Sequence, residues 1–260
     1  MSNILIVGAT RGLGASLANQ YASHPNTTVY GTTRSAEPPK GKGHDEKINW
    51  AKGIDLNQPD VGKKLVEELG SLGVEGGLGI IITAGYFATE DWKTGPKWEE
   101  EVRMYTTSSI APPFLIHSLH SNNYLRPGSK VLLVSSESGS ITLRHSKEGG
   151  GNYAHHASKS ALNMVGKLLS LDLKDQGVVV GIVHPGFMRT EMTKGVGFDK
   201  FWDDGGAVTP DEAAKSLIEW TEKLDMSKTG QYWAPRGPRD IGTADVTIGT
   251  DLPTPLQLPW

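Results

Sequence analysis

The segment Asn3-Ile-Leu-Ile-Val-Gly-Ala-Thr-Arg-Gly-Leu-Gly14 decides the fold of this chain. It opens with a short, mostly β-branched apolar run, which predicts a buried strand. Three glycines follow, spaced as Gly8-x-x-x-Gly12-x-Gly14, and then an amphipathic segment that predicts a helix to about His24. Such glycines permit a tight turn against a pyrophosphate, whose charge the helix N-terminus stabilises. The segment therefore predicts a dinucleotide-binding loop that contacts the cofactor through Gly8, Thr10, Arg11, Gly12, Leu13 and Gly14.

Strands and helices are predicted to alternate along the rest of the chain. The further strands are 28–31, 48–51, 78–83, 130–134, 178–183 and a short one at 231–233, and the further helices are about 59–69, 97–121, 155–175 and 209–224. Near-continuous apolar strands that alternate with helices indicate a parallel sheet covered on both faces. We therefore expect one doubly wound α/β Rossmann domain over residues 1–260. The proline-rich segment 251–260 is expected to be irregular.

Composition narrows the functional classes. The chain has 260 residues, a formal net charge of -3 and no cysteine. A weakly negative charge does not favour nucleic acid or an anionic membrane as a partner, and the lack of cysteine excludes disulfides and thiolate chemistry. The sequence has neither a signal-peptide pattern nor an apolar run long enough to span a membrane. We expect a soluble cytoplasmic protein that binds no metal.

Two arginines indicate which dinucleotide binds. In the NAD-binding form of this loop, an acidic residue at the end of the second strand holds the adenosine ribose. Here that strand ends in Gly31-Thr-Thr-Arg34, with no acid, and Arg11 lies within the glycine loop. Guanidinium groups suit a 2′-phosphate. The sequence therefore predicts NADP, with Arg34 and Arg11 at the phosphate.

Taken together, the motifs resemble those of the short-chain dehydrogenase/reductase family, over nearly the whole chain. The matching segments, in order, are Gly8–Gly14, Asp55, Thr83-Ala-Gly85, Ser135-Ser136, Ala157-Ser-Lys-Ser-Ala-Leu162 and Pro185-Gly-Phe-Met-Arg-Thr190. The His184-Pro-Gly-x-x-Arg-Thr190 form and the final Leu258-Pro-Trp260 are similar to the carbonyl-reductase-like subgroup.

The resemblance implies roles for several of these positions. In the family a tyrosine exchanges a proton with the substrate, a lysine one turn later lowers its pKa and holds the nicotinamide ribose, and a serine orients the substrate oxygen. By position, the lysine is Lys159 and the serine is Ser136. The cofactor contacts implied are Asp55 and Leu56 at adenine, with Ala84, Gly85, Pro185, Gly186 and Thr190 further along the cofactor. A homodimer or homotetramer through the helices at 97–121 and 155–175 is also implied.

The chain departs from the family pattern at the catalytic positions. Four residues before Lys159 stands His155 in place of tyrosine. Ser108 and Ser109 occupy the region of the family's asparagine. Three interpretations remain open. His155 could be the general acid, because a histidine near neutral pKa donates protons well, although Lys159 disfavours its charged form. Tyr153 could supply a hydroxyl instead, or the site could lack a proton relay altogether.

The leading hypothesis is NADPH-dependent reduction of a carbonyl or imine in a hydrophobic small molecule, in a setting such as secondary metabolism. Ser136 orients the substrate, Lys159 binds ribose, and His155 or Tyr153 donates the proton. A hydrophobic substrate is suggested by Trp92, Trp98, Phe187, Phe198, Phe201 and Trp202, which lie in segments that the family uses for substrate. Packing in the core or at an interface explains the same residues equally well. The alternatives are a redox-neutral cyclase or isomerase on the same scaffold and a non-catalytic NADP-binding protein.

Overall fold

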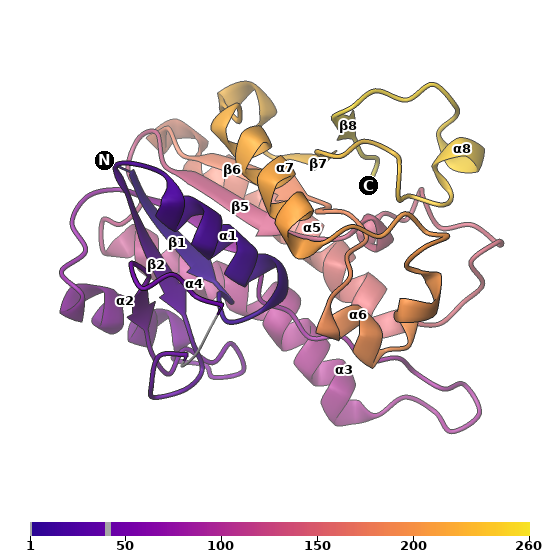
Figure 1. Ribbon diagram of the computed structural model, residues 1–260, viewed down its shortest axis with the longest axis horizontal. Coiled ribbons are helices and arrows are strands. Elements are labelled where there is room, and N and C mark those ends of the chain that lie inside the picture. Colours follow the sequence, from indigo (N-terminus) through magenta and orange to yellow (C-terminus); the bar gives the residue numbers. More distant parts are fainter. Residues whose placement is uncertain (1, 40–42) are drawn as a thin grey trace.

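Strand β1 (Ser2–Val7) pairs in parallel with β2 (Thr27–Thr32) on one side and with β4 (Leu78–Ile82) on the other. The computed structural model, which describes residues 2–39 and 43–260, extends this core to an eight-stranded sheet in the order β3-β2-β1-β4-β5-β6-β7-β8 (Figure 1). The order reverses at β1, as in a doubly wound sheet. The remaining strands are β3 (Asn49–Ala51), β5 (Lys130–Val134), β6 (Val179–Val183), β7 (Gln231–Ala234) and β8 (Leu256–Gln257).

Helices cover both faces of this sheet because its strands are apolar on both sides. Leu5 and Val7 face one core, which is closed by α2 (Val61–Ser71), α4 (Ala111–Ser121) and α5 (Tyr153–Leu173). Ile6 faces the other core, which is closed by α1 (Gly12–Ser23) and α7 (Pro210–Glu222). Figure 1 shows α1 and α7 side by side on the near face. The predicted α/β Rossmann fold is confirmed.

The predicted helix 97–121 is divided into three parts. Helix α3 (Trp98–Tyr105) passes into a π-helical turn at Thr106–Ile110 before α4 begins. Pro112 and Pro113 lie in the first turn of α4, where a missing N–H removes no helical bond. The interruption therefore lies before the prolines and contains Ser108 and Ser109, both buried. π-turns of this kind occur often at functional sites.

Residues of β7 and of the chain that follows it form most of a third apolar cluster beside the sheet. Tyr232 and Leu256 belong to it, together with residues around α8 (Ala244–Thr247). The expectation that 251–260 is irregular was wrong in part, because β8 pairs antiparallel with β7 through Trp233 and Gln257. Two residues of strand are too short for a sequence pattern to reveal. The smaller elements are α6 (Glu191–Gly195) and 3-10 turns at Glu137–Gly139, Lys174–Gln176, Phe198–Phe201 and Met226–Lys228.

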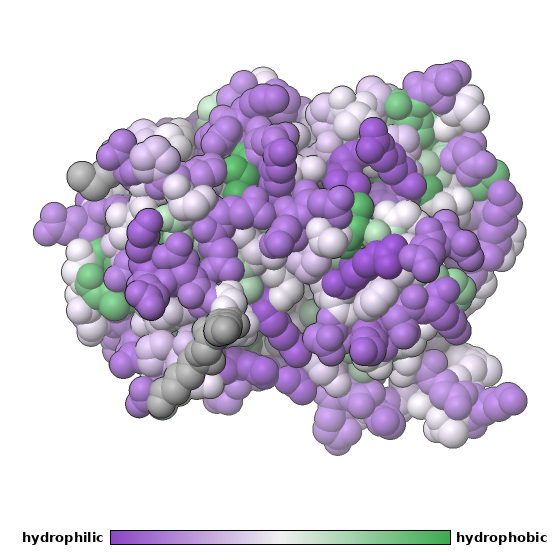
Figure 2. Space-filling view, in the orientation of Figure 1, coloured by the Kyte–Doolittle hydropathy of each residue, from purple (hydrophilic) through white to green (hydrophobic). Residues whose placement is uncertain are grey.

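The surface is mainly hydrophilic on the face seen in Figure 2, with only scattered apolar residues among the polar ones. Within residues 2–39 and 43–260, none of the helices combines the length and apolar character that crossing a membrane requires.

Candidate active site

A cavity of about 1360 Å³ opens at the carboxyl ends of the parallel strands, where open α/β sheets bind their ligands. All the candidate site residues from the sequence line this cavity, although they come from segments far apart in the chain. They are Gly8, Thr10, Arg11, Gly12, Leu13, Gly14, Arg34, Asp55, Leu56, Ala84, Gly85, Ser136, Tyr153, His155, Lys159, Pro185, Gly186 and Thr190.

The glycine loop at one end of the cavity is built by close backbone contacts. A Cβ on Gly14 would lie 2.1 Å from the carbonyl oxygen of Gly8, and one on Gly8 would lie 2.8 Å from the nitrogen of Ala84. Gly8 also has a φ of 95°, which disfavours side chains. Helix α1 starts at Gly12, and no side chain caps its N-terminus. Its first N–H groups are thus available to an anion in the cavity.

Charged side chains surround the next part of the cavity. Arg34 follows β2 and is exposed, as is Arg11 in the glycine loop. Asp55 accepts hydrogen bonds from the backbone N–H and the amide of Asn57, at 3.0 and 2.9 Å. Desolvation raises the pKa of Asp55, but these bonds and the charges of Arg34 and Arg103 outweigh it, so the pKa is lowered overall. Asp55 is therefore an ionised acceptor at neutral pH.

Ser136 lies at the turn that follows β5. Its Oγ accepts a hydrogen bond from the N–H of Ser138 at 3.2 Å and another from the Ser138 hydroxyl at 2.8 Å. The buried hydroxyl of Tyr232 donates to the Ser136 carbonyl. Side chain and backbone of Ser136 are thus both held in place.

A buried polar network fixes this turn against α5. The Ser135 hydroxyl donates to Asn163 Oδ1 at 2.6 Å, and the Asn163 amide donates to the carbonyl of Gly139 at 3.3 Å. A Cβ on Gly139 would lie 2.8 Å from the carbonyl carbon of Lys159, so only glycine allows this approach. The turn bearing Ser136 is therefore locked onto the helix bearing Lys159.

Lys159 is buried, and its Nζ donates to the carbonyl of Val134 at 2.9 Å. Burial lowers its pKa to about 8, because the charged ammonium loses hydration. The group remains mostly protonated at neutral pH and lines the cavity beside Gly85.

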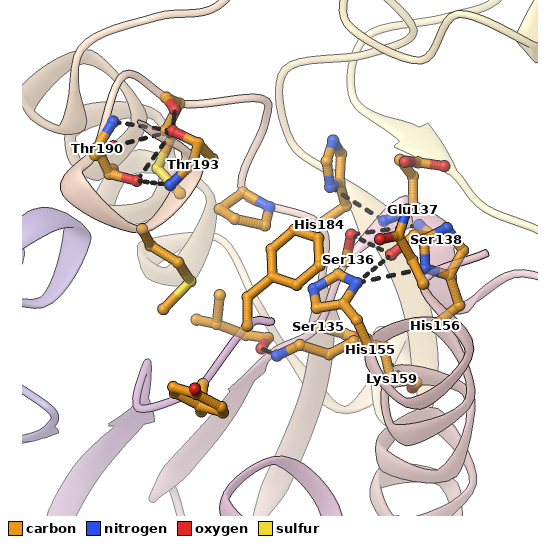
Figure 3. A pocket seen from close by; sticks show the side chains of 18 of the residues that line it. Ser135, Ser136, Glu137, Ser138, His155, His156, Lys159, His184, Thr190 and Thr193 are labelled. Carbon is orange, nitrogen blue, oxygen red and sulfur yellow. Dashed lines mark hydrogen bonds between the residues drawn. The ribbon is translucent and has the colours of Figure 1, made fainter. Parts of the chain in front are cut away.

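His155 lies in the cavity wall one turn before Lys159. Phe87 stacks on its imidazole with ring centroids 4.0 Å apart. Burial, followed by the positive charges of Lys159, His156 and Arg144, lowers the pKa of His155 to about 3. The imidazole is therefore neutral at physiological pH. Its Nδ1 lies 3.4 Å from the Ser138 Oγ and 3.4 Å from the Nδ1 of His156, and Figure 3 shows these groups together at the start of α5.

The side chain of Tyr153, the first residue of α5, lies against an exposed tryptophan at the cavity. Its side chain is 48% exposed and its ring packs against Trp92 at 5.8 Å. A Cβ on Gly150 would lie 3.7 Å from its hydroxyl. The hydroxyl thus lies over the glycine-rich segment 149–151.

The aromatic residues expected at the substrate behave differently from one another. Phe187, Phe198 and Phe201 line the cavity. Trp98 instead lies exposed on α3, and Trp92 is also exposed. Helical and loop tryptophans could not be assigned to the cavity or to the surface from their position in the sequence.

Several contacts that shape the cavity wall were not predicted from the sequence. Phe87 follows Gly85 closely, but nothing in the sequence indicates that it covers His155. His184 accepts a hydrogen bond at Nδ1 from the N–H of Glu137, and its Nε2 lies 3.7 Å from the buried carboxylate of Asp240. Asp240 also accepts from the N–H of Phe187. Such pairs join distant segments, so a sequence pattern cannot reveal them.

Within the described residues, no group of three or more His, Asp or Glu side chains is placed to hold a metal.

A glycine-rich turn ahead of a helix, set across a strand-end cavity from a serine and a lysine, defines a dinucleotide-binding enzyme on the Rossmann scaffold. The family model for short chain dehydrogenase matches residues 2–200. The chain therefore belongs to the short-chain dehydrogenase family, which confirms the resemblance seen in the motifs, and it is an oxidoreductase of this type.

Relatives and solved structures resemble the chain over most of its length. The 1-hydroxy-2-glutathionyl-2-methyl-3-butene dehydrogenase of Rhodococcus sp. (strain AD45) is 27% identical over 241 residues, covering 89% of this chain and 96% of that protein. The carbonyl reductase Sniffer of D. melanogaster has a TM-score of 0.75 and 25% identity, with both chains fully covered. The NADPH-bound carbonyl reductase from chicken fatty liver has a TM-score of 0.75 and 21% identity, covering 90% of this chain and 96% of that one.

Proposed function

We propose that this protein is an NADPH-dependent reductase of a carbonyl or imine group in a hydrophobic small molecule. One observation carries the proposal: a single cavity runs from the glycine loop to Ser136 and Lys159. A dinucleotide bound at the loop can therefore extend towards a substrate held at Ser136. The Rhodococcus relative is a dehydrogenase and the two structural neighbours are carbonyl reductases by name, which supports this reaction class.

The residues present fit NADP. The uncapped N-terminus of α1 suits the pyrophosphate, and the exposed Arg11 and Arg34 suit the 2′-phosphate. Lys159, protonated and buried beside the cavity, suits ribose hydroxyls. When bound, NADPH supplies the hydride of the reduction. The NADPH-bound state of the chicken carbonyl reductase supports this choice of cofactor.

The other end of the cavity suits an apolar substrate. Its lining there includes Phe87, Phe187, Phe198, Phe201 and Met192. Aromatic and thioether side chains bury apolar ligand surface well. The Ser136 hydroxyl, partly exposed to the cavity, is placed to donate a hydrogen bond to the substrate's oxygen or nitrogen.

A test follows the absorbance of NADPH while the protein is offered a panel of aromatic ketones, aldehydes, quinones and cyclic imines. We expect NADPH consumption with a matching alcohol or amine by mass spectrometry. We also expect loss of at least about a hundredfold in kcat for Ser136→Ala, as expected when a hydrogen-bond donor to the reacting atom is removed. Substrate conversion without NADPH consumption would identify a redox-neutral cyclase or isomerase instead. Binding of NADPH with no turnover of any kind would favour the non-catalytic alternative.

We also propose that the protein forms a homo-oligomer through α3, α4 and α5. Large apolar side chains lie exposed on these helices and the turn between α3 and α4: Trp98, Val102, Tyr105, Ile110, Phe114, Met164, Leu168 and Leu171. Such extended apolar surface is characteristic of protein interfaces. Light scattering should give a dimer or tetramer for the native chain and a monomer for Leu168→Glu combined with Phe114→Glu. A native monomer would refute this part of the proposal.

A further inference from the structure

We propose that the cavity selects an aromatic carbonyl compound that also carries a hydroxyl group, and that Nε2 of His155 accepts the hydrogen bond of that hydroxyl. The proposal rests on the proposed reductase function and names the class of substrate that it takes. It makes His155 a substrate-binding acceptor at the position where the family has a proton-donating tyrosine. Ser138, which no sequence motif indicates, becomes the residue that orients His155.

The imidazole of His155 meets its protein partners through one nitrogen and the cavity through the other. Its Nδ1 lies 3.4 Å from the Oγ of Ser138 and 3.4 Å from the Nδ1 of His156. In Figure 3 the dashed lines leave His155 on the side that faces these two residues. Within the described residues, Nε2 has no hydrogen-bond partner, yet it is not one of the fully buried unpaired atoms. Nε2 is therefore open to the cavity that His155 lines.

The hydroxyl of Ser138 determines which nitrogen of His155 carries the hydrogen. Ser138 Oγ donates its single hydrogen to Ser136 Oγ at 2.8 Å, so it presents only lone pairs to His155. The contact between Ser138 Oγ and Nδ1 is therefore a hydrogen bond only when Nδ1 carries the hydrogen. The Nδ1 of His156 is a second acceptor for it when His156 has its own hydrogen on Nε2. A neutral imidazole protonated on Nδ1 has its lone pair on Nε2, where the cavity lies.

The surroundings of His155 keep its ring neutral, so Nε2 keeps this lone pair. Burial, followed by the positive charges of Lys159, His156 and Arg144, lowers the pKa of His155 to about 3. The ring of Phe87, stacked on one face of the imidazole, restrains the plane in which Nε2 lies. Nε2 is thus an acceptor at neutral pH, with no hydrogen to give to a substrate.

Ser136 provides the complementary donor, and only the hydroxyl of Ser138 separates it from His155. The Oγ of Ser136 accepts from both the N–H and the O–H of Ser138. With both acceptor positions engaged, the hydrogen of Ser136 is free to point into the cavity. The cavity therefore presents a donor at Ser136 and an acceptor at His155 side by side. A carbonyl oxygen needs the donor, and a hydroxyl group on the same molecule needs the acceptor.

Apolar side chains line the same end of the cavity. They include Phe87, Phe187, Phe198 and Met192, and aromatic rings pack well on surfaces of this kind. A substrate without a hydroxyl would displace water from Nε2 and leave its lone pair unpaired, which costs free energy. A hydroxylated substrate avoids that cost, and a site built to bind a hydroxyl discriminates against the analogue that lacks it. The cavity is thus suited to hydroxylated aromatic carbonyl compounds.

The position of the hydrogen on His155 can be tested without any substrate. Imidazole nitrogen NMR of the native protein should show a neutral His155 with its hydrogen on Nδ1 at neutral pH. Ser138→Ala removes an acceptor from Nδ1 and should raise the share of molecules with the hydrogen on Nε2. Ser146→Ala, which removes an exposed hydroxyl from the neighbouring loop, is the matched control and should not. A hydrogen resting on Nε2 in the native protein would overturn the proposal whether or not the protein reduces anything.

Binding gives the second test, with 2-naphthol and 2-methoxynaphthalene as probes of the protein saturated with NADP⁺. The first compound has a hydrogen-bond donor that the second lacks. By calorimetric titration the native protein should bind 2-naphthol about fivefold or more tightly than its methyl ether, as one added hydrogen bond allows. In His155→Phe, which keeps a ring but has no acceptor, this ratio should fall to about one, whereas Ser146→Ala should keep the native ratio. Equal affinity of the native protein for both probes would overturn the proposal.

Turnover connects this preference to the reaction. NADPH-dependent reduction of 1-tetralone is compared with that of its derivatives bearing a hydroxyl at each aromatic position in turn, and with their methyl ethers. At least one hydroxylated derivative should exceed both 1-tetralone and its own methyl ether in kcat/KM by about fivefold or more, and His155→Phe should abolish this advantage. Reduction of 1-tetralone by the native enzyme with no such derivative would overturn the substrate class and leave the reductase function intact. Failure to consume NADPH with any carbonyl or imine would instead refute the proposed function.

Discussion

The ring of Phe87 lies nearly parallel to the imidazole of His155, with centroids 4.0 Å apart and an angle of 24° between the planes. Phe87 in turn meets Phe198 edge-on, at 5.6 Å. This stack covers one face of the histidine that stands where the family places a tyrosine. Burial, to which the stack contributes, lowers the pKa of His155 more than any nearby charge does.

Opening the stack should therefore raise the pKa of His155. In Phe87→Ala, water reaches the imidazole and stabilises its charged form, so we expect the pKa to rise by at least about one unit. Imidazole NMR titration measures this directly. Phe114→Ala, which removes an exposed ring from α4, is the control and should leave the value unchanged. An unchanged pKa in Phe87→Ala would show that charges dominate over burial.

Acid should destabilise the protein through the same histidine. Above about pH 6.5 His155 is neutral in both folded and unfolded chains. Below that pH the unfolded chain binds a proton that the folded chain, with a pKa of about 3, does not. Stability is therefore lost as the pH falls, by about 2 to 3 kcal/mol between pH 6.5 and 4.5.

Urea unfolding measures this loss against His155→Gln, which should lack that part of it. His117→Gln, at an exposed position of α4, should retain it. If the free energy of unfolding falls equally with pH in the native protein and in His155→Gln, then His155 is not the cause of the acid destabilisation.

The glycine loop should not tolerate a methyl group at Gly14. A Cβ there would lie 2.1 Å from the Gly8 carbonyl oxygen, and backbone cannot give way cheaply. We expect Gly14→Ala to lose at least about 2 kcal/mol of unfolding free energy. Gly70→Ala in α2 has nothing within 4 Å of its Cβ and should gain up to about 1 kcal/mol. Thermal and urea unfolding compare the two, and similar effects at both sites would contradict the close approach of Gly14 to Gly8.

Cofactor preference should depend on Arg34. Replacing it with aspartate removes a donor to the 2′-phosphate and adds repulsion, so Arg34→Asp should weaken NADPH binding by about thirtyfold or more while NADH binding improves or stays constant. Fluorescence titration with both cofactors measures this. Lys63→Asp, with the same charge change on the exposed face of α2, should alter neither. Unchanged NADPH preference in Arg34→Asp would remove the 2′-phosphate argument.

The Tyr153 hydroxyl should be dispensable. Because its ring packs on Trp92 and its hydroxyl lies by Gly150, Tyr153→Phe should keep kcat within about twofold of the native value, whereas loss of an acid catalyst costs about a hundredfold or more. Steady-state rates with NADPH and a reducible carbonyl decide this. A hundredfold loss in Tyr153→Phe would make the tyrosine the proton donor.

Much of the architecture could be predicted from local pattern. The apolar run Ile4–Val7, the glycines after it and the alternation of strands with helices were enough for the sheet and its two helical layers. Each of these features is indicated by a short hydrophobic period or by local turn residues, so a single chain segment is enough to predict it. The π-turn at Thr106–Ile110 and strand β8 were missed, because each depends on packing against distant residues.

The sequence by itself determined that the motif residues following β1, β2, β4, β5 and β6 meet at one cavity, since the carboxyl ends of parallel strands lie at one edge of the sheet. Only the tertiary structure decided how their side chains face one another. The Phe87 ring over His155, the two Ser138 bonds to Ser136 and the turning of Tyr153 towards Trp92 each depend on how separate segments pack, which local pattern does not specify. Side-chain direction and burial follow from long-range packing, and they set the pKa values and hydrogen bonds on which the chemistry depends.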